Sequence, residues 1–282
     1  MAPGPSAPAS FPRGLPSVPR LGIATRGNTT LDPIDVHFAF ERGVRYFNWC
    51  GKPDGLSRAA REFGPRRREI VFATQIKARS ADAANRELDW ILEETGGSRL
   101  DIGTLYYVES PEEWRAITGP GGAWEALVAR RRAGDLGLLG LTSHQRRLAA
   151  KCALERAADG TRRLDMLMIR YNAAHTGAEF DVFPDSQSRG LPIVTFTGLR
   201  WRDLLRPTPD DPPGFEPPGA ADCYRFCMAH PAVAVALAAP NGRAELQEAL
   251  RALDSPGVPS ARWMQKMREH GRRVHRHARE FW

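Results

Sequence analysis

The sequence lacks the features that mark secreted, membrane-spanning and zinc-binding proteins. Four cysteines in 282 residues are too few for a disulfide framework in a chain of this size. Cys223 and Cys227 lie four residues apart with no cluster of further ligands near them, so no metal site is expected. No apolar run approaches the roughly 20 residues of a membrane span, and residues 1–20 lack the basic start and apolar stretch of a secretory signal. These absences predict a cytoplasmic protein without a metal or membrane partner.

The chain also lacks a concentrated charge of one sign. Its 40 Lys and Arg residues exceed its 33 Asp and Glu residues by seven, and the charges are spread along the sequence. This balance permits anionic ligands such as phosphates but does not indicate a nucleic-acid-binding protein. We therefore expect a small-molecule substrate or ligand as the partner. The sequence leaves the oligomeric state open.

Short apolar segments alternate with helical patterns from residue 20 to residue 254. The apolar segments are nearly continuous, as is typical of parallel strands that are covered on both faces. Eight strand–helix units in this length fit a closed (β/α)₈ barrel of roughly 250 residues. The expected strands lie at 21–25, 45–49, 69–74, 100–108, 136–142, 164–171, 191–197 and 232–240. The alternative, an open doubly wound sheet, normally has a GxGxxG turn after its first strand, and GIATRGN is not such a turn.

Three segments stand apart from the repeating pattern. Residues 1–19 hold six prolines with several Ala, Ser and Gly, which predicts a flexible tail. Residues 255–282 are basic and predict a helix that packs on or beside the barrel. Residues 198–219 carry six prolines after the seventh expected strand. A loop of this length at the carboxyl face of a barrel is expected to lie over the active site.

A series of local segments resembles one protein family in the family's own order. The segments are LGIATRG, ERGVRYFNWC, REIVFATQ, RLDIGTLYYVESP, AGDLGLLGLTSHQ, LMIRYN, IVTFTGLRW and HPAVAVALAAPNGRAELQEAL. Over residues 20–254 the chain thus resembles the aldo/keto reductase family. The resemblance implies a (β/α)₈ barrel that binds a nicotinamide cofactor, usually NADPH, across its C-terminal mouth.

The four catalytic positions that the resemblance implies have all changed. The family uses Asp, Tyr, Lys and His, and the matching residues here are Asn48, Pro53, Gln75 and Glu109. In the family the Tyr donates the proton that the nascent alkoxide needs, and a positioned acid contributes about 10²–10⁴ in rate. Asn48, Pro53 and Gln75 have no labile proton. The ordinary mechanism of the family is therefore not expected to operate unchanged.

Other polar residues are expected at the mouth of the barrel and provide candidates for proton transfer. Strand periodicity places Lys77 on the same face as Gln75, and Glu109 on the same face as Tyr107. His144 follows the fifth expected strand. Lys77, Glu109 and His144 are the candidate acids and bases.

Each candidate also has a structural interpretation. Glu109 would then only form an ion pair with Arg170 or Lys77, and His144 and His175 would be surface-loop residues. Asn172, which shares a face with Arg170, is expected to order the end of the sixth strand.

The cofactor positions implied by the resemblance are better kept than the catalytic ones. Thr142 and Ser143 match residues that hold the nicotinamide carboxamide, although the family's Gln is replaced by Met168. Phe196 matches the aromatic residue that stacks on the nicotinamide, for which any ring face serves. The remaining candidate contacts are Thr197, Leu199, Arg200, Arg202, Asn241 and Arg243.

The preference between NADP and NAD is left open by the sequence. Glu245 matches the family's Arg beside the adenosine phosphate and is a poor neighbour for a 2′-phosphate. Arg243 is close enough in sequence to compensate, and the N-terminus of the last barrel helix favours an anion.

Three hypotheses for the function are consistent with the sequence. The leading hypothesis is an aldo/keto reductase-like oxidoreductase that binds NAD(P)H with a reworked active site. The alternative is a catalytically silent nucleotide- or ligand-binding barrel that acts as a regulator or partner subunit. A further alternative is a cofactor-free isomerase or lyase that uses Glu109 and Lys77 as acid and base.

Overall fold

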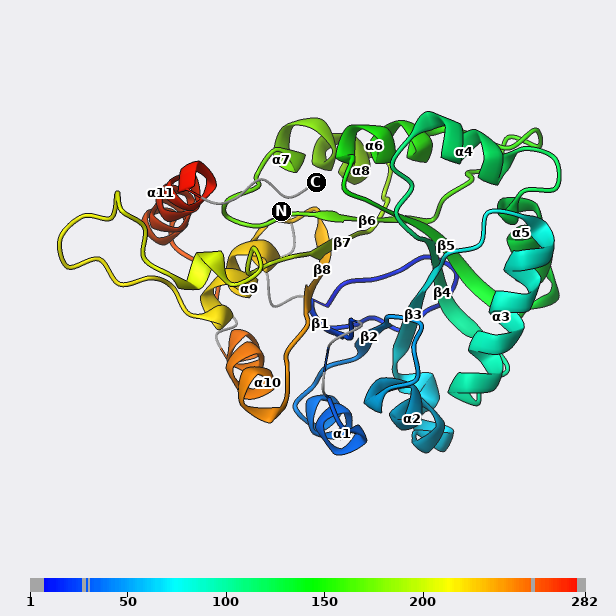
Figure 1. Ribbon diagram of the computed structural model, residues 1–282, viewed down its shortest axis with the longest axis horizontal. Coiled ribbons are helices and arrows are strands. Elements are labelled where there is room, and N and C mark those ends of the chain that lie inside the picture. The colour runs from blue at the N-terminus through cyan, green and yellow to red at the C-terminus, as the bar shows by residue number, and fades with distance from the viewer. Residues whose placement is uncertain (1–7, 27–28, 30, 255–256, 278–282) are drawn as a thin grey trace.

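The computed structural model describes residues 8–26, 29, 31–254 and 257–277. Within these residues, eight parallel strands close into a barrel in the order of the sequence (Figure 1). The strands are β1 (Leu21–Ala24), β2 (Tyr46–Trp49), β3 (Val71–Ile76), β4 (Leu100–Leu105), β5 (Leu136–Ser143), β6 (Met166–Arg170), β7 (Ile193–Phe196) and β8 (Val233–Ala238). This confirms the (β/α)₈ barrel that the sequence predicts.

Helices surround the barrel and cover the outer faces of its strands (Figure 1). They are α1 (Pro33–Glu41), α2 (Gly55–Glu62), α3 (Ala81–Thr95), α4 (Pro111–Thr118), α5 (Ala123–Ala133), α6 (Arg146–Leu154), α7 (Ala178–Asp181), α8 (Phe183–Ser188), α9 (Ala220–Ala229), α10 (Arg243–Leu250) and α11 (Ala261–His277), with 3₁₀ turns η1 (Gly64–Glu69), η2 (Asp203–Leu205) and η3 (Arg251–Leu253). None of the helices in the described part of the chain combines the length and apolar character needed to cross a membrane.

The apolar side chains form one core inside the barrel and another between the barrel and its helices. Side chains alternate along a strand, so successive residues face opposite sides. In β2, Tyr46 belongs to the inner core, whereas Phe47 and Trp49 belong to the outer one. The same alternation turns Asn48 inward, where it lines a cavity at the mouth. The alternation along β2 therefore places both its inner core residue, Tyr46, and its cavity residue, Asn48, on the inside of the barrel.

Residues 8–18, which the sequence assigns to a flexible tail, pack against the end of the barrel at which the strands begin. Ala9 and Val18 exchange two backbone hydrogen bonds of 2.7 and 2.9 Å. Phe11 is buried and stacks on Tyr46 with ring centroids 5.6 Å apart. Arg13 pairs with Asp165, just before β6. The packing arises because Phe11 and Val18 belong to the apolar core inside the barrel, which the proline content of the segment does not reveal. Residues 1–7 of the expected tail lie outside the described residues.

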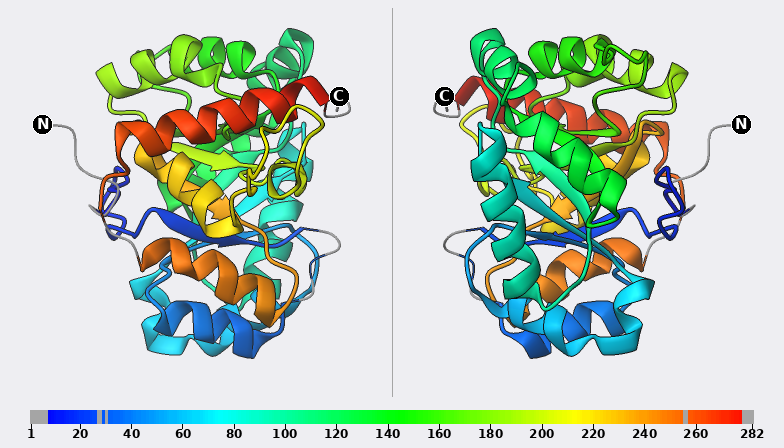
Figure 2. Two further views of the ribbon diagram at one scale, coloured as in Figure 1. Left: turned by 90° about the vertical axis from the view of Figure 1, so that its left-hand side faces the viewer. Right: turned by 90° about the vertical axis from the view of Figure 1, so that its right-hand side faces the viewer.

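Helix α11 runs along the side of the barrel between α7 and α9 (Figures 1 and 2). Gly271 permits this close approach, because a Cβ atom there would lie 2.0 Å from the carbonyl oxygen of Ala173. Ion pairs hold the helix in place: Arg268 reaches Glu179 at 2.9 Å and Arg273 reaches Asp211 at 2.5 Å. Residues 255, 256 and 278–282 of the expected C-terminal helix lie outside the described residues.

Candidate active site

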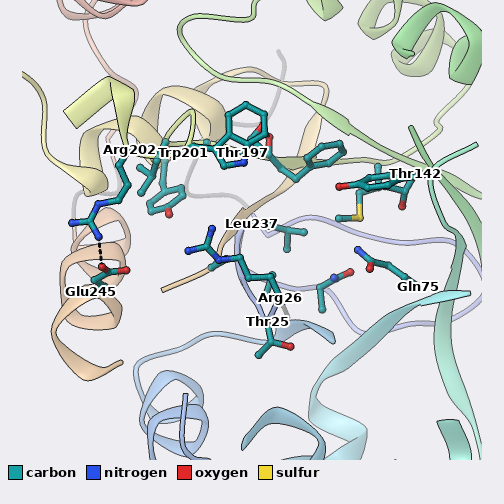
Figure 3. Close-up of a pocket in the computed structure, with 18 residues that line it drawn as sticks. Thr25, Arg26, Gln75, Thr142, Thr197, Trp201, Arg202, Leu237 and Glu245 are labelled. Carbon is teal, nitrogen blue, oxygen red and sulfur yellow. Dashed lines mark hydrogen bonds and ion pairs between the residues drawn. The ribbon is translucent and has the colours of Figure 1, made fainter. Parts of the chain in front are cut away.

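A cavity of about 220 Å³ opens at the carboxyl ends of the barrel strands (Figure 3). Thr142 and Gln75 lie at one end of it, and Arg202 and Glu245 lie at the other. The sequence-predicted residues that line it are Asn48, Gln75, Thr142, Phe196, Thr197, Leu199 and Arg202, together with Met168 and Glu245. Strand ends and the loop after β7 therefore converge on one site, as the barrel fold requires.

Two buried polar atoms in this cavity have no hydrogen-bond partner in the described structure. They are the amide oxygen Oδ1 of Asn48 and the hydroxyl oxygen Oγ1 of Thr142. Both side chains are almost fully buried. An unsatisfied buried polar atom costs about 1–3 kcal/mol, so such atoms are rare unless a ligand or water completes them. Both atoms are thus available to a polar group bound in the cavity.

The loop after β7 reaches the cavity through strained backbone. Four of its non-glycine residues have left-handed conformations: Thr197 (φ 57°), Arg200 (φ 49°), Trp201 (φ 52°) and Arg202 (φ 77°). Asn172 fixes the start of this loop, because its Nδ2 donates to the carbonyl oxygen of Thr197 at 2.7 Å. A strained backbone persists only where surrounding contacts hold it in place, and such strain is common at ligand sites. Asn172 accordingly orders the backbone at this end of the barrel, as the sequence suggests.

An ion pair spans the outer end of the cavity. Arg202 Nη1 donates to Glu245 Oε1 at 2.6 Å (Figure 3). Glu245 also accepts a hydrogen bond from the backbone N–H of Asn241 at 2.9 Å, at the N-terminus of α10. Arg243 does not line the cavity, because its Nε donates to Asp35 at 2.6 Å and its guanidinium stacks on Phe38. The expected compensation of Glu245 by Arg243 is therefore not in place.

Lys77 and Pro53 do not reach the cavity. Strand β3 ends at Ile76, so the alternation that relates Lys77 to Gln75 stops before Lys77. The Lys77 side chain is exposed, and its backbone N–H donates to the Glu87 carboxylate at 3.0 Å. Pro53 is exposed in the loop after β2.

Glu109 also lies outside the cavity. Its Oε1 accepts a hydrogen bond from the backbone N–H of His144 at 2.8 Å, which ties the loop after β4 to the loop after β5. Strand β4 ends at Leu105, and the left-handed backbone of Tyr107 (φ 43°) breaks the alternation beyond it. The side chain that lines the cavity is Tyr107, not Glu109.

Tyr107 is the functional candidate to which sequence reasoning gave no role. It lies among aromatic groups: its ring centroid is 4.6 Å from that of His144, and the His144 ring meets Phe196 edge-on at 5.3 Å. Burial and the neighbouring Tyr106 raise the pKa of the Tyr107 hydroxyl above its ordinary value. The hydroxyl therefore keeps its proton at neutral pH. The only sequence signal was its shared face with Glu109.

His144 forms a pair with Arg170 behind this aromatic group. Arg170 Nη2 lies 2.6 Å from His144 Nδ1. Burial, followed by the positive charge of Arg170, lowers the pKa of His144 to about 4. The imidazole is therefore neutral at neutral pH, with Nδ1 accepting from the guanidinium. His144 lines a second cavity rather than the first.

Four further cofactor candidates from the sequence lie beside the cavity without lining it. Ser143 is buried, and its Oγ accepts from the backbone N–H of Gln145 at 2.9 Å. Arg200 is buried next to Trp201, and Asn241 and Arg243 make the α1 and α10 contacts already described. No group of three His, Cys, Asp or Glu side chains in the described residues is placed to hold a metal ion.

The comparisons with known proteins concern the fold. No protein-family model matches the sequence, and no curated protein matches it. An aldo-keto reductase from Klebsiella pneumoniae, solved with NADPH, superimposes with a TM-score of 0.71 at 17% identity, over 91% of this chain and 92% of that one. The holo form of an aldo-keto reductase from Bacillus halodurans gives a TM-score of 0.74 at 14% identity, over 95% of both chains. The chain therefore has the aldo-keto reductase fold.

Proposed function

We propose that this chain is an aldo-keto reductase-like oxidoreductase that binds a nicotinamide nucleotide in the cavity at the barrel mouth. The observation that carries the proposal is the pairing of an aromatic wall, Phe196, with the unsatisfied polar atoms of Asn48 and Thr142. A carboxamide has both a donor and an acceptor, and the N–H groups of such an amide would complete these two oxygens. The nicotinamide ring would lie against Phe196.

The nicotinamide, when bound, supplies or accepts a hydride. The chain's own part is to orient the ring, exclude water and hold a proton for the oxygen that becomes an alcohol. Tyr107 is the residue proposed for the last role, because it lines the cavity and stays protonated. A general acid works best with a pKa near the working pH. The raised pKa of Tyr107 therefore predicts slower reduction than an activated tyrosine supports.

The proposed cofactor is NAD(H) in preference to NADP(H). Glu245 places a carboxylate at the end of the cavity beside α10, and it is already paired with Arg202. Arg243, the other cation at this turn, is paired with Asp35. A 2′-phosphate near Glu245 would meet like charge, whereas a 2′-hydroxyl would find a hydrogen-bond acceptor.

A fluorescence titration of the full chain with NADH and NADPH tests the binding proposal. We expect saturable binding that weakens about tenfold in Phe196→Ala, because the stacking wall is removed. Phe180→Ala is the matched control, since Phe180 is 82% exposed on α7 and should bind as the wild type does. No binding of either nucleotide, or equal loss in both variants, would contradict the proposal.

The second candidate is a silent nucleotide-binding barrel, and one observation favours it. The residues that the resemblance assigns to the family's four catalytic positions are Asn48, Pro53, Gln75 and Glu109, and of these only Asn48 and Gln75 line the cavity. Nucleotide binding without turnover of any aldehyde or ketone would support this candidate. The cofactor-free isomerase or lyase loses its basis, because Glu109 and Lys77 do not share the cavity.

A further inference from the structure

A second cavity, of about 550 Å³, lies between the ends of β5 and β6 and the last turns of α11. It shares no lining residue with the first cavity. Four arginines line it: Arg146 at the start of α6, Arg170 at the end of β6, and Arg272 and Arg276 on α11. No carboxylate is among its lining residues in the described chain. The helix that forms its outer wall is seen in Figure 2 beside α7.

The positive charge of this cavity is only partly neutralised. Arg146 pairs with Asp181 at 2.9 Å, and Arg276 pairs with Asp210 at 2.6 Å. Arg170 and Arg272 have no ion pair with a carboxylate among the residues that the structure describes. Within the described part of the chain, two positive charges therefore face the cavity without an ion-paired carboxylate.

Arg170 is the most unusual of these groups. Its Nε is buried and has no hydrogen-bond partner in the described structure, while Nη2 bonds to the neutral His144. Its guanidinium lies over the Trp201 ring at 5.5 Å. Burial and then the charge of Arg200 lower the pKa of Arg170. A half-buried cation held among other cations is stabilised when an anion binds beside it.

Three histidines add hydrogen-bonding capacity to the same wall. They are His144, His175 and His275. Burial, then Arg200 and Arg170, lower the pKa of His175 to about 3. His175 and His144 are thus neutral at pH 7, and His275 meets His175 edge-on at 5.5 Å. Neutral imidazoles can donate or accept hydrogen bonds to a ligand without adding repulsion.

We propose that this cavity binds the phosphoryl group of a small phosphorylated molecule. A phosphate monoester carries close to two negative charges at neutral pH, which matches Arg170 and Arg272, the two lining arginines without an ion pair in the described chain. The guanidinium groups come from three elements, α6, β6 and α11, so they surround the cavity. The oxygens of a phosphoryl group are arranged tetrahedrally and can accept hydrogen bonds from several directions, whereas the two oxygens of a carboxylate lie in one plane. The site does not depend on the proposed nucleotide binding.

Calorimetric titration of the full chain with inorganic phosphate tests the proposal, at pH 7.5 and at ionic strength matched with chloride. The wild type should bind phosphate saturably. Arg272→Gln should weaken binding about tenfold or more, because a charge-assisted hydrogen bond is lost. Arg272 is exposed, so the variant should melt as the wild type does without phosphate. Arg262→Gln removes the same charge from an exposed position of α11 outside the cavity and should bind normally.

Three outcomes would overturn the proposal. They are the absence of saturable phosphate binding, equal weakening in Arg262→Gln and Arg272→Gln, and tighter binding of citrate than of phosphate. A parallel titration of Asn48→Ala separates this site from the nucleotide site, because Asn48 lines the first cavity and not the second. Phosphate binding should be unchanged in that variant even if nucleotide binding is lost.

Discussion

Arg202 and Glu245 close the outer end of the candidate nucleotide cavity with an ion pair of 2.6 Å. The pair links the strained loop after β7 to the N-terminus of α10, and Glu245 also accepts from the Asn241 backbone N–H. Both partners are partly exposed, so the pair contributes little to the stability of the fold. Under the proposed nucleotide binding, the pair affects what can bind at this end, because Glu245 is the position that the resemblance assigns to the side chain beside the adenosine phosphate.

The first prediction concerns cofactor choice. Glu245→Gln keeps the size of the side chain and removes its charge, and it frees Arg202 from its carboxylate. We expect NADPH binding to tighten about five- to tenfold relative to NADH, since a like charge is removed and a cation is released. Paired fluorescence titrations measure the ratio. Glu248→Gln on the same helix is the control, and an equal shift there would contradict a local effect.

The second prediction concerns the proposed proton donor. Tyr107→Phe should lower the rate of NADH-dependent aldehyde reduction by about 10²-fold, with nucleotide affinity nearly unchanged. Tyr106→Phe is the comparison variant, because the Tyr106 ring stacks on Tyr107 at 3.9 Å but does not line the cavity. It should keep or raise the rate, since the Tyr106 hydroxyl contributes to the raised pKa of Tyr107. Single-turnover kinetics separates chemistry from binding. Full activity in Tyr107→Phe would show that another group, or water, provides the proton.

The third prediction concerns Glu109, which the sequence proposed as an acid or base. Its observed contact is acceptance of the His144 backbone N–H at 2.8 Å. Glu109→Gln keeps an acceptor oxygen, so activity should change less than threefold. Glu109→Ala removes the acceptor and should cost about 1 kcal/mol of unfolding free energy. Turnover and denaturant unfolding measure the two effects, and a 10²-fold loss in Glu109→Gln would restore the catalytic role.

The fourth prediction concerns stability below neutral pH. His144 and His175 have folded-state pKa values of about 4 and about 3, against an ordinary value of 6.5. Between these values the unfolded state binds more protons than the folded state, so the unfolding free energy falls as pH falls from 6.5 towards 4. The groups that oppose protonation are Arg146, Arg170, Arg200 and His275.

Melting temperatures recorded from pH 7.5 to pH 4.5 test this dependence. His175→Asn should make the melting temperature fall less steeply with falling pH. In the wild type His175 is neutral in the folded state and gains a proton on unfolding, and asparagine cannot take up that proton. His37→Asn is the control, since His37 lies on α1 beside Glu62 and far from the arginines. A decline of the same slope in all three proteins would contradict the assignment to the histidines of the second cavity.

The start of α4 has a sequence signal that the pattern of eight strand–helix units does not include. Helix α4 begins after Ser110, whose Oγ accepts from the Glu113 backbone N–H at 3.2 Å, with Pro111 in its first turn. Ser-Pro-Glu-Glu is a typical helix start, because the hydroxyl caps a free N–H group and proline needs none.

The sequence by itself determined the barrel and much of the first cavity. Parallel strands that are buried on both faces must be apolar throughout, so eight such runs predict eight strands. Within a strand, the period of two turns Asn48 inward with Tyr46, and Asn48 lines the cavity. Gln75, Thr142 and Phe196, which the resemblance assigns to the site, line the same cavity. These outcomes depend only on neighbours along the chain, which is why the pattern reveals them.

Only the tertiary structure decided which charges face which cavity. Lys77 and Glu109 lie beyond the ends of β3 and β4, where the strand period no longer sets direction. The guanidinium of Arg243 forms an ion pair with Asp35, which lies 208 residues away in the chain. The second cavity joins Arg170 on β6 to Arg272 on α11. An ion pair depends on distance in space, and residues that meet from remote elements leave no period or spacing in the sequence.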